Sequence, residues 1–463
     1  MLAFILCALL ADQQAVLREL TDFLAIPNLA DDTANINRNA AALEQMMQRR
    51  GIATRRLTIE GAPPVVVGDL KADGATRTIA FYAHYDGQPV DPKQWTSPPW
   101  TPVLREVDGE QRLYARSASD DKAPIVAMLA ALDRMRAKNV KPRVNLRFVF
   151  EGEEEAGSPH LGSYLAKYPD VLRPDAWIIC DGPVHQSRRA QLAFGARGVL
   201  TLDLVVYGPA RGLHDGHYGN WVPNPIVALT HLIGSMRDED GRILIDGFYD
   251  DVVPATAAEK EAIAAMPPVE AELRRQFQIG RTEGESLNER ILLPALNVSG
   301  IQSGGVGESA SNTIQTSARA AIDFRLVPAQ TPESVKARVE RHLAAKGWTI
   351  VRDDPDAETR MKSAKLVRVR WGSGYPAART PLDLPLSKEL AAIMTRAGHE
   401  PVRLPTMGGS VPIHLFQQPD NTPAIVLPIV NHDNNQHAAN ENLRLQNLWD
   451  GIEIFEALFA GLQ

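Results

Sequence analysis

Short apolar runs alternate with helical stretches from about residue 60 to 182, and this order limits the possible fold more than any other feature of the sequence. Such an alternation of strand, helix and strand indicates a mostly parallel, doubly wound α/β sheet. Strands are predicted at Pro64–Val67, Thr78–Ala83, Val144–Phe150 and Ala176–Cys180, and a helix at Ala123–Met135. The strand-like Ala424–Val430 and the helical Leu445–Leu462 predict a return to the same layer near the C-terminus.

The middle of the chain has a different order of elements. Its segments follow the β-α-β-β-α-β pattern of the ferredoxin-like fold, and an insertion of 55 residues, Arg237–Ile291, interrupts it. Strands are predicted at Val199–Tyr207, Leu296–Ile301, Ala318–Val327, Trp348–Val351 and Leu366–Trp371, and helices at Asn224–Met236 and Pro332–Lys346. We therefore predict a second domain at residues 197–378, inserted into a first domain made of residues 1–196 and 379–463.

Composition narrows the classes of protein and of metal site. The 463 residues suffice for two or three domains of about 100–200 residues each, and a hydrophobic share of 44% excludes general disorder. The net charge of −7 argues against a binder of nucleic acid or of anionic membranes. With only Cys7 and Cys180, a disulfide framework and a thiolate-rich zinc site are excluded. A metal ion would have to be held by His, Asp and Glu.

The apolar run Leu2–Leu10 leaves the location of the protein open. It is too short to span a bilayer, which takes about 20 apolar residues. It has the apolar length of a signal peptide, although no basic residue precedes Arg18. A signal remnant at residues 1–11 and the first turns of a buried helix both remain open, and with them an exported (periplasmic or extracellular) or a cytoplasmic location.

Histidine and acidic residues stand next to several of these elements. His84 and Asp86 come directly after the strand Thr78–Ala83. A carboxylate in that place can hold one ring nitrogen and orient the other toward a metal. Asp120 and Asp121 precede a helix, where helix capping is the ordinary explanation and metal bridging the functional one.

Three further motifs complete the pattern. Four glutamates lie between residues 151 and 155, directly after the buried strand Val144–Phe150. A solvated acidic loop is the usual explanation, but sites in open α/β sheets form at such strand ends, and like charges packed there need a cation. Asp181 follows the strand Ala176–Cys180, and His437 lies near the C-terminus, where a lone histidine is more often structural.

Together these motifs supply two histidines and three carboxylates. That is enough for two metal ions that share one carboxylate. Zinc accepts such nitrogen and oxygen ligands in catalytic sites, and two metals about 3.5–4 Å apart can activate a hydroxide between them.

These residues resemble the di-zinc peptidase family that includes carnosinase, cytosolic dipeptidases, aminoacylase, acetylornithine deacetylase and the glutamate-releasing carboxypeptidases. The resemblance runs from His84 to His437 in matching order and spacing. The chain length, the insertion and the Glu-Gly-x-Glu-Glu motif are most similar to the carnosinase-like branch. It implies a doubly wound catalytic domain, an inserted ferredoxin-like lid that also dimerises, and a non-proline cis peptide between Asp120 and Asp121.

The resemblance also implies a role for each motif residue. His84 and Asp181 would bind one zinc, His437 and Glu155 the other, and Asp120 would bridge both. Asp86 would orient His84. Aligned on the following Ala156-Gly157-Ser158, Glu154 and not Glu153 would be the general base. Manganese or cobalt could replace zinc.

For the lid, the resemblance implies contacts to substrate. His214 would stabilise the oxyanion in an active site, often that of the partner subunit in a homodimer. Asp215 and Asn220 depart from the family's pattern beside it, so the lid contacts stay open. Asn312, Arg325, Gly409 and Ser410 match positions that bind the substrate carboxylate; a surface salt bridge is the alternative for Arg325, and an ordinary tight turn for the glycine-rich segment.

The function that follows is a metal-dependent exopeptidase that cleaves dipeptides or short peptides through a metal-activated hydroxide. A deacylase of N-acyl amino acids, which would use the same two metals, is the alternative. A metal-binding protein without catalysis should lack a base, whereas Glu154 is present. A dinuclear phosphoesterase is disfavoured by the Glu-Glu pair and by Arg325.

Overall fold

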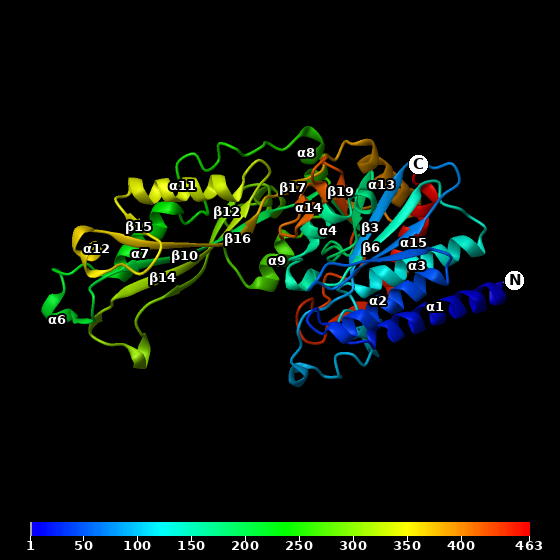
Figure 1. Cartoon of the computed structure of the whole chain (residues 1–463), viewed down its shortest axis with the longest axis horizontal. Coiled ribbons are helices and arrows are strands. Elements are labelled where there is room, and N and C mark those ends of the chain that lie inside the picture. The colour runs from blue at the N-terminus through cyan, green and yellow to red at the C-terminus, as the bar shows by residue number, and fades with distance from the viewer. Residues whose placement is uncertain (1) are drawn as a thin grey trace.

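The computed structural model describes the backbone of residues 2–463 and the side chains from residue 11 onward. Figure 1 shows two α/β units side by side along the long axis of the molecule. The first is built on an eight-stranded sheet of order β1-β2-β6-β3-β7-β19-β8-β18. Its strands are β1 (Ala53–Leu57), β2 (Val65–Leu70), β3 (Thr78–His84), β6 (Asn145–Glu151), β7 (Ala176–Ile179), β8 (Gln191–Ala193), β18 (Val402–Leu404) and β19 (Ala424–Val426).

The centre of this sheet is parallel, as predicted. β6, β3, β7 and β19 run in one direction, whereas β1 and β2 are antiparallel to their neighbours. The predicted strand Ala424–Val430 is shorter in the structure and ends at Val426. Pro428 explains the difference, because proline has no N–H to donate to a strand pairing.

Helices cover both faces of the sheet. Along β3, Ile79 and Phe81 pack into one apolar core, whereas Ala80 and Tyr82 pack into another on the opposite face. This alternation follows from the period of two in a strand, and it makes both faces of the central strands apolar. The first face is covered by α1 (Leu2–Leu24), α2 (Thr33–Gln48), α3 (Lys122–Ala137), α13 (Pro385–Arg396) and α15 (Leu445–Gly461), and the second by α4 (Leu161–Lys167), α5 (Pro169–Leu172) and α14 (Ile413–Gln417).

The second unit is a five-stranded sheet with its own apolar core. Its order is β12-β14-β10-β16-β15, and α7 (Pro225–Met236) and α11 (Pro332–Ala345) pack on it. The strands are β10 (Gly198–Tyr207), β12 (Ala295–Gln302), β14 (Ser317–Leu326), β15 (Thr349–Val351) and β16 (Leu366–Tyr375). The four longer strands pair as a ferredoxin-like sheet, and β15 adds a parallel strand at its edge.

Local sequence explains where the two helices of this unit begin. Asn224 caps α7 by accepting a hydrogen bond from the Ile226 N–H, and Thr331 caps α11 in a capping box with Ser334. Both helices then start with proline, whose missing N–H would be unpaired in the first turn.

The chain joins the two sheets through two adjacent segments, and its insertion also reaches the first unit, where Ala262 of α8 (Ala257–Ala264) packs into the apolar core. Outbound the chain runs from β9 (Gly195–Ala196) into β10, and on return it runs from β16 into β17 (Ala378–Arg379). β9 and β17 pair with each other, and Val199 pairs with Tyr375 just beyond them. The two crossings therefore form one short antiparallel ribbon.

At the N-terminus, the apolar run belongs to the helix α1. The prediction of a signal remnant at residues 1–11 falls almost entirely on residues whose side chains lie outside the described part. Within the described residues, no helix has the length and apolar character needed to cross a membrane.

Candidate active site

The predicted site residues follow strands that end at the same edge of the sheet. β3 ends at His84, which pairs with Glu151 at the end of β6, and the neighbouring β7 leads into Asp181. Because these strands are parallel, their carboxyl ends bring the following loops together.

Asp120 lies between the two histidines. Its Oδ1 is 2.8 Å from Nε2 of His84, and its Oδ2 is 3.1 Å from Nε2 of His437. The same nitrogen of His437 is 3.2 Å from Oε2 of Glu155. Residues 353 positions apart along the chain thus meet around one carboxylate.

The ligand atoms form two groups that share His84. His84, Asp120 and Glu155 make one, and His84, Asp121 and Asp181 make the other; within each group all candidate atoms lie within 4.8 Å of one another. A cation fits this donor set, because Oε1 of Glu155 is a buried oxygen that has no hydrogen-bond donor among the described side chains.

The pKa values of these groups also favour a cation at the cluster. Hydrogen bonds to Asp120 and Glu155 raise the pKa of His437 to about 10. Burial raises the pKa of Asp181 to about 6, and the charges of Asp120 and Glu155 add to that shift while His84 opposes it. The carboxylates therefore favour a nearby positive charge, which a divalent cation supplies.

Asp86 holds both the first histidine and the glutamate pair. It is fully buried, and one oxygen is 3.3 Å from Nδ1 of His84. Its two oxygens accept hydrogen bonds from the backbone N–H groups of Glu154 and Glu155, each at 3.0 Å. One carboxylate thus fixes the ring of His84 and the position of the loop beside it.

Glu154 and Glu153 have different surroundings. Glu154 reaches the cluster, with Oε2 at 3.9 Å from Nε2 of His84. Burial raises the pKa of Glu154 well above its usual range, and the charges of Asp181 and Asp120 raise it further against the opposing effect of His84. Glu153 is instead hydrogen-bonded to the backbone and ring of His160. These contacts place Glu154 at the cluster and Glu153 away from it.

Two further acidic residues, which were not among the predicted ligands, lie beside the cluster. Asp121 accepts a hydrogen bond from the backbone N–H of His84 at 3.2 Å, and the Asp120–Asp121 peptide is cis, as the resemblance implied. Glu441 is fully buried and accepts hydrogen bonds from the backbone of Ser117, Ser119 and Asp120. The only signal for Glu441 in the sequence is its position four residues after His437.

Arg325 and Ser410 come together near the ribbon that joins the two units. Nη1 of Arg325 donates to Oγ of Ser410 at 2.7 Å, and Nε donates to Asp323 at 2.8 Å. Gly409 adjoins them and accepts a hydrogen bond from the backbone N–H of Arg197. The aspartate is an intramolecular partner for Arg325, which leaves only part of its guanidinium for a ligand.

Tyr375, which was not singled out from the sequence, is influenced by the charges of both Arg325 and Glu154. Burial raises the pKa of Tyr375 to about 12, with Arg325 lowering it and Glu154 raising it. Its ring stacks on that of His414, with centroids 5.2 Å apart.

His214 and Asn312 lie apart from the cluster within the chain. They belong to a small two-stranded ribbon in which β11 (Leu213–His214) pairs with β13 (Thr313–Ile314), and the carbonyl of Asn312 accepts from the N–H of Asp215. The following helix, α6 (Asp215–Tyr218), lies at the far end of the five-stranded unit from β3 and β6 (Figure 1). His214 is exposed there.

Comparison with known proteins decides the family. The model of the peptidase family M20/M25/M40 matches residues 80–460. The chain belongs to this family. It is 30% identical over 406 residues to human Beta-Ala-His dipeptidase, covering 86% of this chain and 77% of that protein. It is 27% identical over 417 residues to the Cys-Gly metallodipeptidase DUG1 of Saccharomyces cerevisiae, covering 88% and 83%.

Solved structures of the family have the same fold. A metallo-carboxypeptidase of Sulfolobus solfataricus superimposes with a TM-score of 0.77 at 28% identity, covering 96% of this chain and 98% of that one. Human carnosine dipeptidase 1 gives a TM-score of 0.71 at 25% identity, covering 100% and 99%. The predicted family and α/β class are confirmed, and the M20 chain described here is a metal-dependent peptidase.

Proposed function

We propose that this M20 peptidase is an exopeptidase that hydrolyses the amide bond of dipeptides or short peptides. The observation that carries the proposal is the placement of Asp120 between His84 and His437, with Glu154 beside them. Relatives named as Beta-Ala-His and Cys-Gly dipeptidases support dipeptides as the substrate class.

The residues would hold two divalent cations, for which we propose zinc, with manganese or cobalt as substitutes. Asp120 would contribute to both sites, His84 and Asp181 would complete one, and His437 and Glu155 would complete the other. Bound there, the metals supply Lewis-acid activation of water and of the substrate carbonyl.

Glu154 is the proton carrier in this proposal. Its raised pKa makes the carboxylate a stronger base than an exposed glutamate. It accepts a proton from the attacking water and donates it to the amine that leaves. Asp86 keeps Glu154 in place through its backbone N–H, so that the carboxylate stays within reach of the cluster.

Arg325, with Ser410 and Gly409, would bind the C-terminal carboxylate of the substrate. The hydrogen bond from Arg325 to Ser410 holds the guanidinium in one orientation before substrate arrives. Recognition of a terminal carboxylate limits cleavage to the end of a peptide, which is why we propose an exopeptidase.

The five-stranded unit, residues 197–378, would be an inserted lid and dimerisation domain. Large apolar side chains are exposed on it, among them Trp221 at 79% and Ile301 at 54%, the latter on the edge strand β12. Exposed apolar area of this kind favours burial against a second copy. In such a homodimer His214 and Asn312 would serve the partner's site.

Replacing Glu154 with glutamine tests the assignment of the base. The variant should lose activity by about 10²–10⁴-fold, because the amide cannot carry the proton, while it still binds metal. Glu153→Gln is the matched control and should retain activity, since Glu153 contacts His160 instead of the cluster. Near-normal turnover by Glu154→Gln would contradict the assignment.

The substrate class is tested by measuring released amine from β-alanyl-histidine, cysteinyl-glycine and N-acetyl amino acids, alongside metal analysis of the purified protein. Dipeptide cleavage with about two metals per chain is expected. Cleavage of acyl amino acids alone would replace the proposal with the deacylase alternative.

A further inference from the structure

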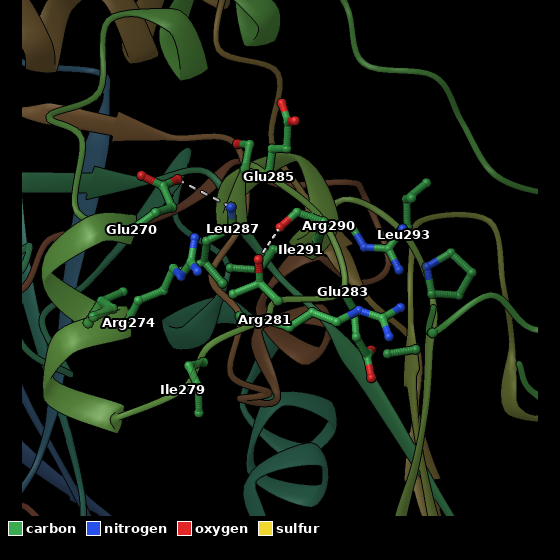
Figure 2. Close-up of a pocket in the computed structure, with 18 of the residues that line it drawn as sticks. Glu270, Arg274, Ile279, Arg281, Glu283, Glu285, Leu287, Arg290, Ile291 and Leu293 are labelled. Atoms are coloured by element: carbon green, nitrogen blue, oxygen red, sulfur yellow. Dashed lines mark hydrogen bonds between the residues drawn. The ribbon is translucent and has the colours of Figure 1, made fainter. Parts of the chain in front are cut away.

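The insertion at residues 237–291 forms one wall of a cavity that lies outside the metal cluster. The cavity has a volume of about 590 Å³. It is bordered by α9 (Glu270–Phe277), the loop that follows it and α10 (Leu287–Ile291), and it reaches Arg197 and Gly408 in the ribbon region between the two units. Figure 2 shows the side chain of Arg274 extending from α9 toward the segment that carries Leu287 and Ile291.

The cavity combines apolar walls with charged groups, five arginines and three glutamates, so cationic side chains outnumber anionic ones. Leu273, Phe277, Ile279, Leu287 and Ile291 line it, and Phe277 is 62% exposed. Cavities of this size with apolar walls and a few polar groups are typical binding sites for small molecules.

Arg197 distinguishes this cavity from an ordinary surface cleft. Its Nε is buried without a hydrogen-bond acceptor, and its Nη1 has only a long contact of 3.5 Å with the carbonyl of Ile291. Among the side chains from residue 11 onward, no carboxylate forms an ion pair with it. Arg197 as a whole is half-buried, and a charge withdrawn from water without a partner is costly, so a bound anion would stabilise it.

The other charged groups around Arg197 do not satisfy it. Burial and the charge of Arg325 together lower the pKa of Arg197 to about 10, although Asp323 opposes this. Asp323 itself is hydrogen-bonded to Arg325. Of the remaining arginines in the cavity, Arg237 pairs with Glu283 at 2.5 Å, and Arg281 pairs with Asp240.

We propose that this cavity is a second binding site, which takes a small organic carboxylate with an apolar body. The carboxylate would pair with Arg197, since a guanidinium binds that group through two parallel hydrogen bonds. The apolar body would lie against Phe277 and Leu287. The site goes beyond the proposed peptidase function, because neither the metal cluster nor Arg325 and Ser410 line it.

Calorimetric titration of the metal-loaded protein with 4-phenylbutyrate tests the proposal. One equivalent should bind, and the neutral 4-phenylbutanamide should bind at least tenfold more weakly, since it lacks the charge that pairs with Arg197. Arg197→Gln should weaken the binding of 4-phenylbutyrate to a similar degree. Arg189→Gln, an exposed arginine elsewhere on the surface, is the matched control and should bind normally.

A second variant keeps the test valid if Arg197→Gln does not fold. Phe277→Ser removes an exposed apolar side chain from the cavity wall, outside the catalytic groups. It should weaken the binding of 4-phenylbutyrate several-fold and leave dipeptide hydrolysis unchanged. Unchanged affinity in this variant would overturn the proposal. So would displacement of the probe by saturating dipeptide, or loss of binding on metal removal, because either places the probe in the catalytic site.

Discussion

Glu441 is a buried carboxylate that joins the loop of His437 to the loop of Asp120. It accepts five hydrogen bonds, all between 2.8 and 2.9 Å, from the backbone of Ser117, Ser119 and Asp120, the hydroxyl of Ser119 and the guanidinium of Arg116. A carboxylate can accept all of these, whereas an amide must turn its NH₂ group toward some of the donors.

Glu441→Gln should therefore weaken metal binding by about 10–100-fold, the usual effect of losing a group that positions ligands. Competition with a chromophoric chelator measures this affinity directly. Glu453→Gln, a partly exposed carboxylate on α15, is the control. Metal affinity equal to that of the unaltered protein would show that Glu441 has only a structural role.

The residues that meet at the cluster could be foreseen from the sequence, as could Asp86 beside His84, whereas Glu441 and Tyr375 could not. His84, Asp181 and the Glu151–Glu155 loop follow parallel strands, whose carboxyl ends must share an edge. What Glu441 and Tyr375 contact depends on where each side chain points, from a loop for Glu441 and from the end of a strand for Tyr375. That direction depends on the packed surroundings, which no local pattern encodes.

At the scale of elements, a three-stranded sheet anchors the segment around His437. It consists of β4 (Val103–Val107), β5 (Glu110–Tyr114) and β20 (Asn442–Arg444). Asp433 ties the segment to it by ion pairs with Arg112 at 2.7 Å and with Arg444 at 3.1 Å. Although burial opposes it, the hydrogen bond from Arg112 and the charge of Arg444 help to lower the pKa of Asp433 from 3.8 to about 2.

This shift predicts a dependence of stability on acid. The folded pKa lies below the unfolded value, so the stabilisation is fully present above about pH 4 and is lost as the pH falls toward 2. Urea unfolding at pH 5, 4, 3 and 2 should show a smaller acid loss in Asp433→Asn than in the unaltered protein. Asp73→Asn, which changes an exposed carboxylate, should lose as much stability in acid as the unaltered protein. If the unfolding free energy of Asp433→Asn fell with pH as steeply as that of the unaltered protein, the assignment would be wrong.

The elements themselves were predicted where a strong period was present. The alternating pattern of Val199–Tyr207 became β10 within one residue of each predicted end. The insertion was predicted because it interrupts the ferredoxin-like order of elements, but its short helices α9 and α10 were not predicted. Their residues pack on distant segments, as Ile291 does close to Gly408, and such contacts leave no period in the sequence.

At the scale of the whole molecule, His214 and the metal cluster lie toward opposite ends of the same subunit (Figure 1). If His214 acts on a partner's site, two inactive variants should complement each other. In a co-expressed mixture of His214→Ala and Glu154→Gln, half of the dimers are mixed and each has one intact site, so about a quarter of full activity is expected.

Each variant expressed alone is the control and should remain inactive. An inactive mixture, with mixed dimers verified by affinity tags, would place His214 in its own subunit's site. Light scattering on Trp221→Asp is a separate check, because a charge on that exposed surface should shift a dimer toward monomers.

The paired crossings between the two units limit how these units can move. A single connecting strand would let one unit rotate freely about its bonds, but here β9 and β17 are hydrogen-bonded to each other. Two joined strands bend easily across their width and resist twisting. Twisting of one unit against the other is therefore resisted at this ribbon, and the insertion adds a second contact, because Ala262 of α8 packs into the core of the first unit.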